Sequence, residues 1–101
     1  DMTATIVHVC RHGQVYNPDH VLYGRLPGFG LSDLGRQMAE RLGEYFADLP
    51  ITHLRVSPLQ RAHETMAPIA ARHPGLELRV VLPDAERTKA PSDCVRSVDI
   101  N

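Results

Sequence analysis

Residues 3–13 read TATIVHVCRHG, an apolar segment that runs directly into a short polar motif. Residues 3–10 are apolar and β-branched without a helical period, which predicts a strand that is buried on both faces. Arg11, His12 and Gly13 follow this strand at once. Since ligands bind outside the carboxyl ends of strands in open α/β sheets, these three residues form a candidate binding site.

Two segments further along the chain carry helix signals. Ser32 is a capping residue for a helix that extends to Asp48. The sequence SPLQ at residues 57–60 is a capping box with proline at the first helical position, and its helix ends at residues 73–75, HPG. We expect each helix to bury one apolar stripe. In the first helix the stripe comprises Leu34, Met38, Leu42, Tyr45 and Leu49, and in the second Leu59, Ala62, Met66, Ile69 and Ala70.

Residues 52–56 and 76–82 have the composition of two further short strands. The order is then strand, loop, helix, strand, helix, strand. This alternation predicts an α/β fold with a mostly parallel sheet sandwiched by helices. The connection formed by residues 11–31 is long for a compact domain, and such loops are commonly functional. It contains Tyr16, Tyr23 and Phe29, which predicts a packed loop.

The composition limits the classes of protein that fit. With 101 residues, the chain is long enough for one domain and too short for two. Its formal net charge of -1 argues against nucleic-acid binding, and no apolar run approaches the roughly 20 residues that span a bilayer. Cys10 and Cys94 form no CxxC pair, so we expect a cytoplasmic protein.

A second basic residue is expected at the same edge of the sheet as the RHG motif. Arg61 lies in the first turn of the helix that follows the second strand. Free N–H groups and a partial positive charge make a helix N-terminus suitable for an anion, and arginine presents a planar fork of donors to a phosphate. The pattern indicates an anion site beside His12, although Arg61 would also suit the solvated face of an amphipathic helix.

Three motifs together resemble the histidine phosphatase superfamily, also called phosphoglycerate mutase-like. They are VHVCRHGQ at residues 7–14, LSDLGRQMAERLGEYF at 31–46 and VSPLQRAHETMAPIA at 56–70, and the resemblance covers residues 5–82. It implies that His12 attacks phosphorus and becomes a phosphohistidine. It also implies that Arg11 and Arg61 hold the phosphoryl oxygens, and that neither a metal nor another cofactor is required.

The resemblance suggests four further site residues, each with a plainer alternative. Asn17 matches a phosphate-contacting asparagine, or it is a turn residue before a proline. Gly24 and Arg25 line the substrate mouth, or they form a simple turn. Glu86 stands at a plausible distance for the proton donor, but its surroundings do not match the family, so it also fits a solvated charge.

The family pattern includes a second histidine in a downstream Gly-His motif that this chain does not contain. We therefore expect residues 1–83 to be the N-terminal part of a histidine phosphatase domain, apparently truncated, and residues 84–101 to be a divergent or disordered tail. Such a piece leaves a sheet edge unpaired, which predicts marginal stability and homodimerisation or aggregation through that edge.

The leading functional hypothesis is a phosphomonoester hydrolase that acts on a small phosphorylated substrate. A phosphoglycerate mutase-type phosphotransferase and a catalytically incomplete phosphate-binding fragment are the alternatives. A metal site is a third class, because His8, Cys10 and His12 alternate along one strand and face the same side. Three ligands on one strand rarely complete a tetrahedral site, so a hydrogen-bonded His8 and a packed Cys10 are the plainer interpretation.

Overall fold

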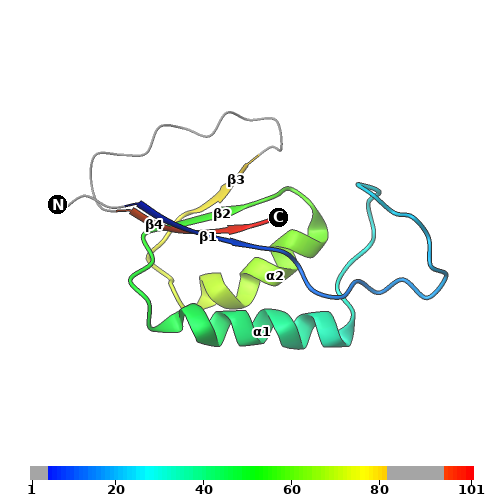
Figure 1. Ribbon diagram of the computed structural model, residues 1–101, viewed down its shortest axis with the longest axis horizontal. Helices are drawn as coiled ribbons and strands as arrows, with labels where there is room; N and C mark the ends of the chain where they lie inside the picture. Colours follow the sequence, from blue (N-terminus) through cyan, green and yellow to red (C-terminus); the bar gives the residue numbers. More distant parts are fainter. Residues whose placement is uncertain (1–4, 82–94) are drawn as a thin grey trace.

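The structure, a computed structural model, describes residues 5–81 and 95–101 of the chain. The strands in these residues form one sheet in the order β1-β4-β2-β3, in which every neighbouring pair is parallel. Both helices lie on the same side of this sheet (Figure 1). The predicted α/β class with a parallel sheet is therefore confirmed. In chain order the elements are β1 (Thr5–Cys10), α1 (Asp33–Ala47), β2 (His53–Val56), α2 (Gln60–Ala71), β3 (Leu78–Val80) and β4 (Val95–Ile100).

The hydrophobic core lies between the sheet and the two helices. It includes alternate residues of the two central strands, β4 and β2, and residues on one face of α2. Its fully buried members include Leu54, Val56, Val98 and Ile100 from the strands and Ala62, Met66 and Ile69 from α2. The apolar face predicted for α2 is thus the face that packs. No helix in the described residues is both long and apolar enough to cross a membrane.

Helix α1 begins where the sequence predicts but buries a different face. The Ser32 Oγ accepts a hydrogen bond from the backbone N–H of Gly35 at 3.1 Å, as a capping residue should. The predicted stripe is largely outside the core, with Leu34 51% and Met38 45% exposed. The buried residues are Gly35, Ala39, Gly43 and Phe46. The prediction was wrong because it followed the large side chains, whereas small ones let α1 approach α2 closely. A Cβ on Gly43 would lie 3.0 Å from the Cβ of Pro68.

Helix α2 does not begin with the predicted capping box. It starts at Gln60, after Leu59 as N-cap, and no side chain caps it. The Ser57 Oγ accepts a long hydrogen bond from the N–H of Leu59 at 3.4 Å, and the Ser57 N–H donates to the Ile100 carbonyl at 3.0 Å. Gln60 donates to Glu64 instead of returning to Ser57. Pairing of residue 57 with the sheet thus replaces the reciprocal bonds that a capping box requires.

Two strands differ from the prediction in their positions. β1 was expected to be buried on both faces, but it is an edge strand that pairs only with β4 among the described residues. Its exposed apolar residues are Ile6 at 43%, Val7 at 43% and Val9 at 55%. β4 was expected to belong to a divergent or disordered tail, yet residues 95–100 form a buried central strand. Alternation in VRSVDI explains this, because it directs the apolar residues Val98 and Ile100 into the core.

Candidate active site

Parallel pairing brings the ends of β1 and β2 to one edge of the sheet. Cys10 is in register with Ile100 of β4, and Ile100 is in register with Val56 of β2. Adjacent strands are about 4.8 Å apart, so the ends of β1 and β2 lie about 10 Å apart across β4. The residues after β1 and the N-terminus of α2 thus share this edge, as the sequence predicts.

His12 is half-buried and held at this edge by two hydrogen bonds. Its backbone N–H donates to the Asn101 carbonyl at 3.3 Å. Its ring Nδ1 lies 2.9 Å from the carbonyl oxygen of Gly13. A carbonyl oxygen only accepts, so Nδ1 carries the proton and Nε2 keeps a lone pair. In the neutral ring, the contact selects the tautomer in which the lone pair is on Nε2.

Arg61 is buried at the N-terminal turn of α2, with 4% of its surface exposed. Its Nη2 donates to the carbonyl oxygen of Gly24, and its Cζ lies 4.7 Å from the centre of the Tyr23 ring. Its Nε is buried and has no hydrogen-bond partner. The ion pairs among the described residues do not include Arg61. The site therefore holds a buried guanidinium with an unused donor.

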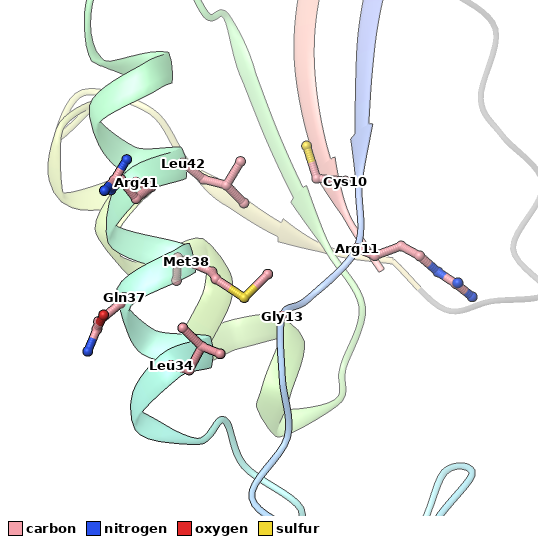
Figure 2. Close-up of a pocket in the computed structure, with 9 residues that line it drawn as sticks. Cys10, Arg11, Gly13, Leu34, Gln37, Met38, Arg41 and Leu42 are labelled. Carbon is pink, nitrogen blue, oxygen red and sulfur yellow. The ribbon is translucent and has the colours of Figure 1, made fainter.

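Arg11 borders a groove between β1 and α1. The groove has a volume of about 540 Å³, and its lining residues are Cys10, Arg11, Gly13, Leu34, Gln37, Met38, Ala39, Arg41 and Leu42. Figure 2 shows Leu34, Met38 and Leu42 pointing from α1 toward β1, while the side chain of Arg11 is directed away from α1. The apolar stripe predicted for α1 is thus the wall of this groove. The Arg11 side chain is exposed and points away from this wall.

The remaining expected site residues lie in different settings. Both polar atoms of the Asn17 side-chain amide bond to the backbone of Val21: Nδ2 donates to its carbonyl at 2.8 Å, and Oδ1 accepts from its N–H at 3.0 Å. These bonds close a local turn. Gly24 has a positive φ of 48° and supplies the acceptor for Arg61. Arg25 is exposed, and Glu86 lies outside the described residues.

Glu64 is a residue of this region that the sequence analysis did not single out. Its carboxylate accepts from the Leu31 N–H at 2.7 Å, from Gln60 Nε2 at 3.1 Å and from Arg36 Nη2 at 3.1 Å. Partial burial opposes ionisation of Glu64, but these hydrogen bonds and the charge of Arg36 outweigh it, so the pKa is lowered. Glu64 ties the end of the long loop to α2. The sequence shows only the four-residue spacing between Gln60 and Glu64, because the other partner, Leu31, is 33 residues away.

The residues considered for a metal site have other partners. His8 Nε2 accepts from Arg96 Nε at 3.0 Å, and its ring packs edge-on against Phe46. Burial raises the pKa of the Cys10 thiol, and the negative charge of Asp99 raises it further. Within residues 5–81 and 95–101, no three His, Cys, Asp or Glu residues form a cluster that could hold a metal ion.

Comparisons with known proteins add to this geometry. The model of the histidine phosphatase superfamily (branch 1) matches residues 7–84. Uncharacterized protein Rv0525 of Mycobacterium tuberculosis is 58% identical over 69 residues, which cover 68% of this chain and 34% of that protein. Fructose-2,6-bisphosphatase TIGAR B of Danio rerio is 45% identical over 58 residues, which cover 56% of this chain and 23% of that protein.

A solved phosphatase structure is also similar to this chain. The mycobacterial glucosyl-3-phosphoglycerate phosphatase Rv2419c matches with a TM-score of 0.62 and 34% identity, over 72% of this chain and 34% of that one. The chain thus spans about one third of the length of Rv0525 and of this phosphatase.

Proposed function

The chain belongs to the histidine phosphatase superfamily, and from this membership we propose that it hydrolyses small phosphomonoesters through a phosphohistidine on His12. The observation that carries the proposal is the buried guanidinium of Arg61, which has an unused Nε and no acid partner among the described residues. A buried cation without a counter-ion is costly, and a bound phosphoryl group offsets that cost.

In the first step, Nε2 of His12 attacks phosphorus. A P–N bond forms while the bond from phosphorus to the ester oxygen breaks. The leaving oxygen takes a proton from an acid, for which we propose Glu86. In the second step, water attacks phosphorus, the P–N bond breaks, and the carboxylate of Glu86 takes the proton of the water. The Gly13 carbonyl, which accepts from Nδ1, holds the ring in the attacking tautomer throughout.

The arginines supply the charge that phosphoryl transfer needs. The transition state spreads negative charge over the nonbridging oxygens, and fixed donors that neutralise them give most of the acceleration. We assign this role to Arg61 and Arg11. Asn17, Gly24 and Arg25 are proposed to line the substrate mouth, where the exposed guanidinium of Arg25 can meet an anionic substrate.

Hydrolysis of p-nitrophenyl phosphate tests the proposal. Replacing Arg61 with Lys keeps the charge but removes the planar fork, and we expect a loss of about hundredfold in rate. Arg41→Lys is the matched control, because Arg41 is exposed on α1 and points away from β1 (Figure 2). Equal rates for Arg61→Lys and the unsubstituted chain would contradict the proposal.

Phosphate binding without turnover is the second candidate function. It is favoured by the buried Nε of Arg61, which has no hydrogen-bond partner and is free to donate to a phosphate oxygen. It uses the same Arg61 site and needs neither the nucleophile nor the proton donor. Inorganic phosphate that binds to a chain without activity toward any phosphomonoester would select this candidate.

We further propose that two copies of the chain pair through β1. This strand has one unpaired edge among the described residues, and its exposed side chains include the apolar Ile6, Val7 and Val9. An unpaired apolar edge is a template for another strand. The cytoplasmic location remains a proposal as well.

A further inference from the structure

The surroundings of Arg61 contain an aromatic residue that no step of the proposed reaction uses. The Tyr23 ring lies under the guanidinium, with its centre 4.7 Å from Cζ, and stacks on Phe29 with 5.0 Å between centres and 22° between planes. A ring face attracts a cation most strongly where water is excluded, as it is around this 4%-exposed arginine. Tyr23 therefore constrains the plane of the Arg61 guanidinium from the long loop.

The polar contacts of Arg61 are incomplete in the same place. Nη2 donates to the Gly24 carbonyl, and the buried Nε has no acceptor. Gly24 follows Tyr23 directly and has a positive φ of 48°, which directs its carbonyl oxygen toward the arginine with little steric cost for glycine. One turn of the loop thus fixes both the plane of the Arg61 guanidinium and the position of its Nη2.

We propose that Tyr23 is the positioning residue for Arg61 in phosphoryl binding. A phosphoryl oxygen displaces the Gly24 carbonyl from Nη2 and gives Nε its missing acceptor, while the ring of Tyr23 keeps the plane of the guanidinium. This inference rests on the proposed function, because it takes the ligand of Arg61 to be a phosphoryl group. Tyr23 itself touches the arginine and not the phosphorus.

Binding of inorganic phosphate to the full chain separates this role from simple packing. Tyr23→Phe retains the ring face, so we expect binding within twofold of the unsubstituted chain. Tyr23→Leu retains apolar bulk without the face, and we expect binding about three- to tenfold weaker. Leu22→Ala is the control, since Leu22 is the neighbouring residue and is 98% exposed. Thermal melting establishes that each variant is folded.

The outcomes separate the positioning role of Tyr23 from the proposed function on which it rests. If the unsubstituted chain binds no phosphate, the proposed function fails and the inference fails with it. If it binds phosphate and Tyr23→Leu binds equally well, the positioning role is wrong and the proposed function stands. Weaker binding in Tyr23→Phe than in Leu22→Ala would also overturn the role, because the ring face is still present.

A spectroscopic measurement on the unsubstituted chain covers the case in which Tyr23→Leu does not fold. In ¹H–¹⁵N spectra of arginine side chains, the Nε–H signal that disappears in Arg61→Lys belongs to Arg61. We expect the face of the Tyr23 ring to shift this signal upfield of the signal of free arginine. Saturating phosphate should then move it downfield, because the Nε–H gains a hydrogen-bond acceptor. A signal at the position of free arginine, with or without phosphate, would overturn the inference.

Discussion

Replacing Gly35 with Ala tests the packing that holds the RHG segment against α1. A Cβ built on Gly35 would lie 2.1 Å from the carbonyl oxygen of Gln14, far inside van der Waals contact. That oxygen cannot move freely, because it accepts from the Ser32 N–H at 2.9 Å and from the Ser32 Oγ at 3.1 Å. The substitution must therefore displace either the start of α1 or the chain that follows His12.

The expected size of the effect comes from two opposing contributions. Overpacking at a rigid contact costs about 1–3 kcal/mol, whereas exchanging glycine for alanine in a helix gains about 1 kcal/mol. At Gly35 the cost lies in the upper part of its range, about 2–3 kcal/mol, because the clash is with backbone. We expect the free energy of unfolding to fall by about 1–2 kcal/mol, and the melting temperature by about 4–15 °C for a domain of this size.

Urea denaturation followed by circular dichroism measures this change, with Gly75→Ala as the matched control. Gly75 is exposed, and a Cβ there would meet no atom within 4 Å. Alanine at this position should be neutral or slightly stabilising. A Gly35→Ala chain as stable as Gly75→Ala would refute the close contact between α1 and the loop.

Two further predictions concern charge and the sheet edge. The pKa of Glu64 is lowered in the folded chain, so its contribution to stability is full above the ordinary value of 4.5 and is lost as pH falls through the lowered folded pKa. Glu64→Gln should cost about 1 kcal/mol at pH 7 and remove that loss at acid pH in urea titrations; an unchanged pH profile would contradict it. Val9→Lys places a charge on the exposed edge strand β1 and should convert a dimer to a monomer in light scattering, whereas Asp33→Lys on α1 should not. A chain that is monomeric without any substitution would contradict pairing through β1.

The sequence predicts the elements whose signals are local. Ser32 specifies the start of α1, and the spacing of Ala62, Met66 and Ile69 specifies the buried face of α2. The residue range of β1 and the RHG motif at its end also follow from local composition. Because all strands in the described residues are parallel, these local predictions suffice to bring His12 and the N-terminus of α2 to one edge.

The features that the sequence does not predict depend on distant residues. Among the described residues, β1 pairs only with β4, whose residues come 90 positions later in the chain. No local pattern therefore identifies β1 as an edge strand. The buried face of α1 depends on Pro68 and Gln14, which its glycines approach. Tyr23 was expected in a packed loop, but its partner Arg61 is 38 residues away and no periodic pattern connects the two.

Trapping of the phosphoenzyme tests the central claim most directly. The chain is incubated with a reactive phosphodonor and analysed by intact mass, beside His12→Ala and the control His20→Asn. His20 is exposed with a positive φ of 52°, a conformation that asparagine tolerates. We predict an acid-labile adduct of one phosphoryl group that is absent only in His12→Ala. No adduct on a chain that is folded and binds phosphate, or an adduct that persists in His12→Ala, would contradict the account.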